Sequence, residues 1–326
     1  MSPGPVTHGA RRLRRRSPWT ITVVALLALA GPWIAPYPPE EQEDVAGARL
    51  LRPWTRAQAL AAGPHRTLIV TGLHQTPDGW AFDRAGRRQT LPAADVTEKP
   101  SPRFYLLGTD ALGRDLLSRL LYGMRHSVGL AALCVMLALL VGIGAGALAG
   151  LAGGLWDEML MRGVEVLMSI PRLLLVLVCA ALFRPSIPVL VLVLGGTTWT
   201  GLARIVRAEA LAFRESGPAQ AARAAGSSVP RLVLRYLVPQ IAPVLAVFAA
   251  LRLADTIVLE SALSFLGLGV PPPAVSLGDI LASGREVLQE AWWVAAAPGA
   301  MIAAIILIVR SASRDLVRLQ DPPSMT

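Results

Sequence analysis

Gln220–Gly226 (QAARAAG), followed after nine residues by Tyr236–Pro239 (YLVP), is a short polar stretch between long apolar ones. Gly217-Pro218 precedes it, and proline is tolerated in the first turn of a helix because its missing N–H is not needed there. Gly226 closes the stretch, as glycine does where a helix end requires a left-handed conformation. Ser227–Pro230 then turns the chain into the next helix. The pattern predicts a short, rigid helix that projects from a membrane bundle into water or, more simply, an amphipathic connector between two spanning helices.

The composition of the whole chain points to a membrane protein. Hydrophobic residues make up 53% of its 326 residues, only 16% are charged, and the mean hydropathy is +0.51. Soluble domains of this length rarely have such values. The net charge of +9 is carried almost wholly by arginine, and beside such apolar runs membrane topology explains it better than nucleic-acid binding. Cys134 and Cys179 lie in apolar runs, which predicts buried core residues and neither a disulfide nor a metal site.

Stretches of about 20 mostly apolar residues predict membrane-spanning helices. Six stretches meet or nearly meet this length, namely 18–37, 127–150, 163–184, 187–204, 239–262 and 291–310. The arginines within residues 1–17 make this a basic segment and place the N-terminus in the cytoplasm. Six crossings then return the C-terminus to the cytoplasm, together with the arginine-rich loop 208–232. We therefore expect a multi-pass protein of a bacterial plasma (inner) membrane with both termini cytoplasmic.

The first apolar stretch also has a second interpretation. Ala28–Ala30 resembles a signal-peptidase site after a basic region. The apolar run continues to Tyr37, however, beyond the usual length of about 7–15 residues for the apolar region of a signal peptide. An uncleaved first helix over 18–37 is therefore favoured, and cleavage would leave the topology of the other spans unaltered.

Two further patterns predict packing and a separate segment. Gly142, Gly146 and Gly150 lie four residues apart, so they line one helix face that should pack tightly on another helix, within the chain or across a subunit interface. Residues 38–104 are polar, with a strand expected at Thr67–Thr71 and a hairpin within 80–90. This predicts a small, β-rich, extracytoplasmic insertion. Its histidines and acidic residues have no metal-ligand or catalytic spacing, so no cofactor is expected.

A second long motif occupies residues 107–127 (LGTDALGRDLLSRLLYGMRHS), and a third occupies residues 260–270 (ESALSFLGLGV). In the second motif Thr109 or Asp110 can cap a helix, and its leucines recur at helical spacing, which predicts an interfacial amphipathic helix. No Gly-Lys-Ser/Thr follows its glycines, so we reject a phosphate-binding loop.

All three motifs resemble those of one protein family. Residues 107–127 are similar to L-G-T-D-x-x-G-R-D-x-x-S-R-x-x-Y-G-x-R-x-S, and residues 260–270 are similar to E-A-S-L-S-F-L-G-L-G-V. These patterns are typical of the C-type permease subunit of dipeptide, oligopeptide and nickel importers that are driven by ATP-binding-cassette (ABC) ATPases. The opening stretch resembles the family's E-A-A-x3-G-x9-I-x-L-P signature, with Gln220 in place of Glu. The resemblance covers residues 105–322, and a usual Gly-Asp pair before Ser313–Asp315 is absent.

The resemblance implies an all-α polytopic membrane protein of about six transmembrane helices with the ABC importer permease (MetI-like) fold. Residues 105–322 would form the permease domain, and 38–104 a small β-rich external insertion. In this family the loop that matches 217–230 docks in a groove of the ATPase, which assigns coupling to Gln220, Ala221, Ala222, Gly226 and Pro239. The implied partners are a second (B-type) permease, two ABC ATPase subunits, an extracytoplasmic substrate-binding protein and membrane lipid, with no nucleic acid.

Ionisable residues in the apolar stretches are candidates for the translocation path, because charges at membrane depth usually face the protein interior or water. Arg252 and Asp255 are three residues apart and can pair on one helix face, and Glu260 lies near the outer end. Arg252 and Asp255 either form a self-neutralised structural pair or line the path of the substrate, which Glu260 could also line. Arg172 follows Pro171 and is expected to snorkel from the inner end of the third stretch.

Together these observations predict the permease subunit of an ATP-driven importer for di/oligopeptides or a related small solute, forming half of the translocation pore. The chain has no Walker motif, so ATP hydrolysis is expected on partner subunits and the chain itself is not an enzyme. An ion-coupled secondary transporter that acts without an ATPase is the alternative. A membrane-embedded enzyme has no support, because the four histidines are scattered at 8, 65, 74 and 126. The substrate, whether peptide, nickel, opine or another solute, stays open.

Overall fold

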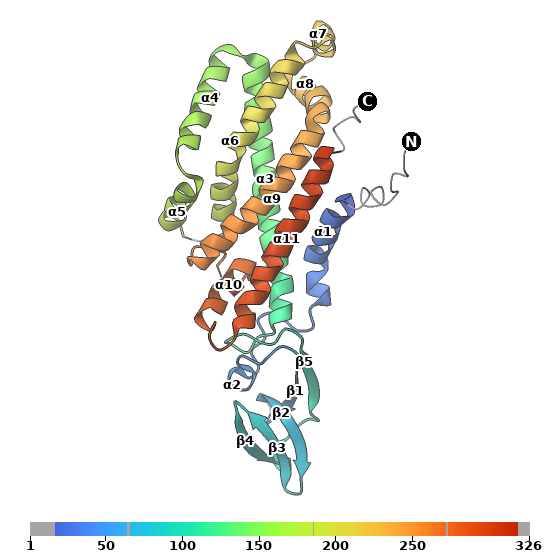
Figure 1. The fold of residues 1–326 in the computed structure, drawn as a ribbon, viewed down its shortest axis with the longest axis vertical. Helices are drawn as coiled ribbons and strands as arrows, with labels where there is room; N and C mark the ends of the chain where they lie inside the picture. Colours follow the sequence, from blue (N-terminus) through green and yellow to red (C-terminus); the bar gives the residue numbers. More distant parts are fainter. Residues whose placement is uncertain (1–16, 64–65, 185, 272, 319–326) are drawn as a thin grey trace, which may run out of the picture. The chain divides into compact units, whose positions relative to one another are not determined.

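The computed structural model describes residues 17–63, 66–184, 186–271 and 273–318 (Figure 1). The chain divides into two compact units. The described residues of the helical unit lie within 17–26, 128–260 and 304–318. The second unit contains residues within 27–127 and 261–303, including all five described strands.

Long helices dominate the described chain. They are α1 (Ser17–Ile34), α3 (Leu116–Ala152), α4 (Gly154–Ser169), α5 (Arg172–Leu182), α6 (Ile187–Arg214), α9 (Val238–Phe265) and α11 (Trp292–Arg318). Shorter helices are α2 (Val45–Ala48), α7 (Gly217–Ala224), α8 (Val229–Leu232) and α10 (Leu277–Glu286). Within the described residues four helical stretches are long and apolar enough to cross a membrane, namely Leu116–Ala152, Ile187–Arg214, Val229–Phe265 and Trp292–Arg314. They correspond to the second, fourth, fifth and sixth predicted spans.

The third predicted span, 163–184, is wrong as a single helix. α4 ends at Ser169, Ile170 is extended with φ −92° and ψ 128°, and α5 begins after Pro171. The residue before a proline is driven out of the helical region, and proline has no N–H to continue the helical hydrogen bonds. An apolar run that looks continuous in sequence is therefore two helices of 16 and 11 residues.

The amphipathic helix predicted before the second span is not a separate element. Residues 116–126 form the first turns of α3, which continues without a break to Ala152. Its cap is Asp115, and neither Thr109 nor Asp110. The Oδ2 atom of Asp115 accepts hydrogen bonds from the backbone N–H of Ser118 at 2.8 Å and from its hydroxyl at 2.7 Å. Both Asp115 and Ser118 are buried.

The glycine stripe of α3 packs on α6 within the helical unit, which confirms the predicted close approach and places it inside the chain. A Cβ atom added at Gly142 would lie 2.9 Å from Leu202, and one added at Gly146 would lie 2.5 Å from the carbonyl oxygen of Ala203. One added at Gly150 would lie 2.6 Å from the Cβ of Ala210. The two backbones can be this close only because the α3 face carries no side chains.

Five antiparallel strands form the sheet of the second unit (Figure 1). They are β1 (Thr55–Ala61), β2 (Thr67–Thr76), β3 (Gly79–Arg84), β4 (Arg87–Pro92) and β5 (Ser101–Tyr105), in the order β4-β3-β2-β1-β5. The predicted strand at Thr67–Thr71 and the predicted hairpin are confirmed. Ala85 and Gly86 both have positive φ (51° and 72°), which suits a two-residue turn between β3 and β4. Alternating residues form two apolar clusters, one around Phe82 and one around Ile69.

Candidate coupling helix and translocation site

The helix α7 begins and ends with defined caps. Ser216 is its N-cap, and the Ser216 hydroxyl accepts a hydrogen bond from the N–H of Ala219 at 3.4 Å. At the other end the N–H of Ser227 donates to the carbonyl of Ala222 at 3.0 Å, and the N–H of Gly226 donates to that of Arg223 at 2.9 Å. With Gly226 at φ +76°, these two bonds form a Schellman motif. The helix predicted from Gly217-Pro218 and Gly226 is therefore confirmed with its expected ends.

One face of α7 is fixed to the helical core and the other faces outward. Ala219 is fully buried and belongs to the cluster that contains Phe213 of α6 and Ile241 of α9. Ala222 is 8% exposed. Beside them, the rings of Phe213 and Tyr236 stack with centroids 6.5 Å apart. α7 is therefore packed into the same apolar cluster as residues of α6 and α9.

The five residues assigned to coupling differ in how far they are buried. Ala222 lies in the buried face, whereas the other four are exposed, namely Gln220, Ala221, Gly226 and Pro239. The side-chain amide of Gln220 donates to the carbonyl of Glu215 at 3.2 Å. Gln at this position therefore holds the loop before α7 by a neutral hydrogen bond, where a carboxylate could not donate.

A π-helical turn, Val233–Leu237, joins α8 to α9. The N–H of Val238 donates to the carbonyl of Val233, five residues earlier. Pro239 explains the wider turn, because it has no N–H to donate to the carbonyl four residues before it and its ring would clash there. Pro239 thus determines the shape of the turn that leads from α8 into α9.

A pocket of about 450 Å³, here called the charged pocket, lies within the helical unit between α6, α9 and α11. Arg252 and Asp255 both line it, and their Nη1 and Oδ2 atoms are 3.5 Å apart. Arg310 of α11 contributes a second guanidinium, with its Nη2 atom 3.2 Å from Oδ1 of Asp255. Glu260 is fully buried and is not among the described residues that line this pocket. The predicted trio is therefore divided, with Arg252 and Asp255 together and Glu260 apart.

Arg310 lines the pocket although the sequence did not indicate this, because it stands at the last position of the predicted span 291–310. The helix α11 continues to Arg318, so Arg310 lies well before its end. Arg172 is also placed differently from the prediction, because it does not snorkel. Its guanidinium donates to the hydroxyl of Thr198 at 2.6 Å and to that of Thr197 at 3.3 Å, which ties α5 to α6.

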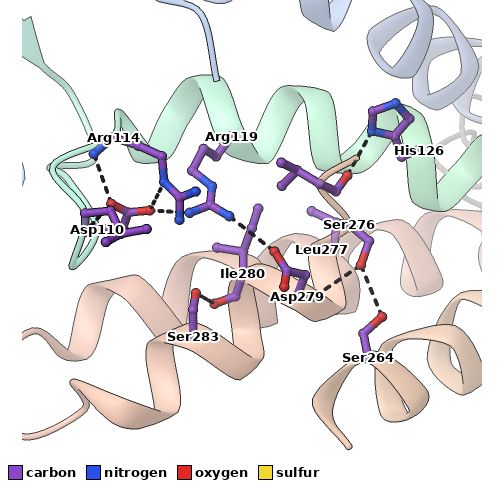
Figure 2. Close-up of polar contacts among 12 residues, drawn as sticks. Asp110, Arg114, Arg119, His126, Ser264, Ser276, Leu277, Asp279, Ile280 and Ser283 are labelled. Atoms are coloured by element: carbon purple, nitrogen blue, oxygen red, sulfur yellow. Dashed lines mark hydrogen bonds and ion pairs between the residues drawn. The ribbon is translucent and has the colours of Figure 1, made fainter. Parts of the chain in front are cut away.

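In the second unit, the motif at 107–127 forms a network with α10 (Figure 2). Asp110 accepts hydrogen bonds at 2.9 Å from the N–H groups of Leu112 and Arg114, and its carboxylate pairs with Arg114 and Arg119. Arg119 also reaches Asp279 of α10, with its Nη2 atom 3.2 Å from Oδ2. The charged side chains of this motif therefore connect the loop at Asp110 with the first turns of α3 and α10.

The third motif closes the same network (Figure 2). Ser264 and Ser276 bring their hydroxyl oxygens within 3.3 Å, and the hydroxyl of Ser276 also accepts from the N–H of Asp279 at the start of α10. His126 of α3 bonds the carbonyl of Val275 at 2.9 Å. These contacts from the two long motifs connect α3, α9 and α10 in the second unit, and the candidate transport residues lie in α7 and the charged pocket.

The chain is similar to the membrane components of known transport systems. Residues 142–319 match the family described as "binding-protein-dependent transport system inner membrane component". The di/tripeptide transport system permease protein DppC of Pseudomonas aeruginosa (strain UCBPP-PA14) is 30% identical over 300 residues, which cover 92% of this chain and 84% of that protein. A permease protein assigned to a peptide transport system in Brucella suis biovar 1 (strain 1330) is 36% identical over 221 residues, 67% of this chain and 73% of that protein.

A solved structure shares the fold. A chain of the MetNI methionine ABC transporter in an inward-facing conformation superposes with a TM-score of 0.50 at 18% identity, over 63% of this chain and 97% of that chain. The matching family model and the relative from Pseudomonas aeruginosa confirm the family predicted from the three motifs, and the chain belongs to the inner-membrane components of binding-protein-dependent transport systems.

Proposed function

We propose that this chain is the permease subunit of an ATP-driven, binding-protein-dependent importer of di- or oligopeptides. The observation that carries this proposal is α7, a capped helix with one face buried against α6 and α9 and the other face exposed. The family supports binding-protein-dependent transport, and the names of the relatives support peptides as the class of substrate. In this proposal ATP binding closes two ATPase subunits, α7 moves with them, and the bundle opens outward to receive substrate.

The proposal also includes a topology and a set of partners. α1 and the α4–α5 pair complete about six membrane-crossing segments beside the four long helical stretches. Residues 1–17, the loop 208–232 and the C-terminus are cytoplasmic, whereas the sheet within 38–104 is extracytoplasmic. The permease domain, 105–322, pairs with a second (B-type) permease in the lipid bilayer and receives substrate from an extracytoplasmic binding protein.

Co-purification tests the proposal most directly. The tagged chain is extracted from its native host in mild detergent and its partners are identified by mass spectrometry. We expect an ATPase with Walker motifs and a second permease. Recovery of the chain alone, under conditions that preserve a control ABC complex, would instead favour an ion-coupled secondary transporter.

A matched pair of variants locates the contact. Ala221 is exposed on α7, so Ala221→Trp should block docking and reduce the recovered ATPase without disturbing the buried face. Ala94 is exposed in the second unit, and Ala94→Trp should leave the recovery unchanged. Equal recovery of the ATPase with both variants would show that α7 is not the docking site.

A further inference from the structure

We infer that the pocket between Arg252, Asp255 and Arg310 binds the terminal carboxylate of a peptide during its passage. This inference rests on the proposed function and adds to it a chemical requirement on the substrate. Residues of three helices in one unit line the pocket. Of the described residues that line it, Arg252, Asp255 and Arg310 are the charged ones.

The charges of the pocket do not cancel. Two guanidiniums share one carboxylate, since Oδ2 of Asp255 is 3.5 Å from Nη1 of Arg252 and Oδ1 is 3.2 Å from Nη2 of Arg310. The pocket therefore carries one excess positive charge. In a membrane-spanning region an uncompensated charge is costly, so an entering anion is stabilised there. Each guanidinium has five N–H donors, and Asp255 engages one terminal nitrogen on each.

The shape of the pocket suits a carboxylate attached to a larger group. The guanidinium of Arg252 lies over the ring of Phe248, 5.2 Å from its centroid, which fixes the plane of the donors. Gly201 places no side chain beside this guanidinium, and a Cβ atom added there would lie 3.4 Å from Nη2 of Arg252. Apolar walls come from Ile205 and Leu251. A volume of about 450 Å³ exceeds what a lone ion needs and lies in the range of small-molecule sites.

Asp255 also makes such a site suitable for transport. A translocation site has to bind strongly enough to admit the substrate and weakly enough to release it. Asp255 keeps one terminal nitrogen of each arginine paired, so neither guanidinium is left without a partner when the peptide leaves. The fork geometry of arginine matches a carboxylate specifically, which a Lys at the same place would reproduce only as a charge.

The test uses the complete transporter with its binding protein in proteoliposomes, with tri-alanine and its C-terminal amide as probes. The binding protein is loaded to a measured level with each peptide and supplied at saturation, so that its own selectivity does not limit the rate. We expect wild type to import the acid faster than the amide. Arg252→Gln should lower the initial rate for the acid about tenfold and that for the amide less than about twofold, as loss of a charged hydrogen bond predicts.

Further variants guard against a purely structural effect. Arg310→Gln alters the more exposed guanidinium, 54% against 34% for Arg252, and should reproduce the selective loss. Arg252→Lys keeps the charge and should restore part of the acid rate. Arg162→Gln is the matched control, because Arg162 forms a solvent-exposed pair with Glu165 and does not line the pocket.

Three outcomes would overturn the inference. They are equal losses for acid and amide, no preference for the acid in wild type, and unchanged acid uptake in both glutamine variants. Equal losses together with a dissociated second permease would assign the pocket to a subunit contact. Binding-protein-stimulated ATP hydrolysis is measured in parallel. Its absence in wild type would contradict the proposed function itself, whereas its retention in the variants limits any failure to the carboxylate site.

Discussion

At the scale of single residues, Gly226 provides the sharpest test of coupling. Its φ of +76° disfavours any side chain, although no atom lies within 4 Å of an added Cβ. Gly226→Val should therefore strain the backbone by about 1–2 kcal/mol without a steric clash. We expect the end of α7 to fray and peptide uptake to fall about tenfold at this energy, while membrane insertion is retained. Uptake and membrane content are measured together.

The control for this variant is Gly217→Ala. Gly217 opens the same helix, also has free space around an added Cβ, and is not among the glycines with positive φ. Uptake should be close to that of wild type. Unchanged uptake in Gly226→Val would contradict the coupling role of α7.

Asp44 makes the sheet sensitive to acid. Burial acts to raise the pKa of Asp44, but hydrogen bonds from Arg84, Gly47 and Ile69 outweigh burial and hold this pKa below its usual value. The ionised carboxylate therefore stabilises the folded sheet above the unfolded pKa, about 3.9, and this contribution is lost as pH falls through the lower folded pKa. Protection of the Ile69 amide from hydrogen exchange should accordingly drop below about pH 4.

Two substitutions separate this effect from general acid damage. Asp44→Asn should lose protection already at neutral pH, by about 3 kcal/mol, because it leaves the guanidinium of Arg84 without its buried partner. Asp95→Asn, at an exposed carboxylate, should behave as wild type. A protection factor for Ile69 that is unchanged by Asp44→Asn would show that this pair does not hold the sheet.

Residues governed by local backbone rules were predictable from sequence, and residues governed by tertiary contacts were not. Gly226 and Pro218 act through the conformation of their own turns, so their roles could be predicted. The cap of α3 could not, because Thr109, Asp110 and Asp115 are all competent caps. Thr109 is instead engaged with the backbone of Ala48 and Leu51, far away in sequence. The place of Arg310 in the charged pocket could not be predicted for a similar reason, since only the packing of α11 against α9 brings it to Asp255.

At the scale of elements, the pairing of α3 with α6 depends on close approach of the two backbones. Gly146→Leu should be severely destabilising, because its Cβ atom would lie 2.5 Å from the carbonyl oxygen of Ala203. Overpacking costs about 1–3 kcal/mol when neighbours can shift, and here the neighbour is backbone, so we expect at least the upper value. The midpoint of thermal unfolding of the purified protein in detergent measures the loss.

Gly144 supplies a control on the same helix. An added Cβ at this position meets no atom within 4 Å, so Gly144→Leu makes an equal change in volume and hydropathy without the clash. Its unfolding midpoint should remain near that of wild type. Similar losses for both variants would mean that helix propensity or lipid contact, and not the α3–α6 packing, explains the effect.

The elements also show where the length and hydropathy of an apolar run are enough to predict a helix. Apolar runs located α6, α9 and α11 to within a few residues at their starts, because length and hydropathy define a spanning helix. The same criterion joined α4 and α5, since it takes no account of the conformation that Pro171 imposes on Ile170. Within 38–104 the turn residues predicted one hairpin, whereas the pairing of β1 with β5 joins residues too distant for such rules.

At the scale of the whole molecule, the proposed topology puts two exposed positions on opposite sides of the membrane. Asp78 lies in the turn between β2 and β3, and Ala224 is exposed at the end of α7. Because the loop 208–232 is rich in arginine, it should stay in the cytoplasm, whereas a long segment such as 38–104 can be translocated despite its charges. The two sites should therefore differ in their access to a membrane-impermeant reagent.

Cysteine labelling of intact cells tests this topology. Asp78→Cys should react with an impermeant maleimide once the outer membrane is permeabilised. Ala224→Cys should react only after the inner membrane is permeabilised as well. The native Cys134 is buried and Cys179 is partly buried, so the parent chain should label weakly and serves as background. Labelling of Ala224→Cys in cells with a sealed inner membrane would invert the proposed orientation, and α7 could then not reach an ATPase in the cytoplasm.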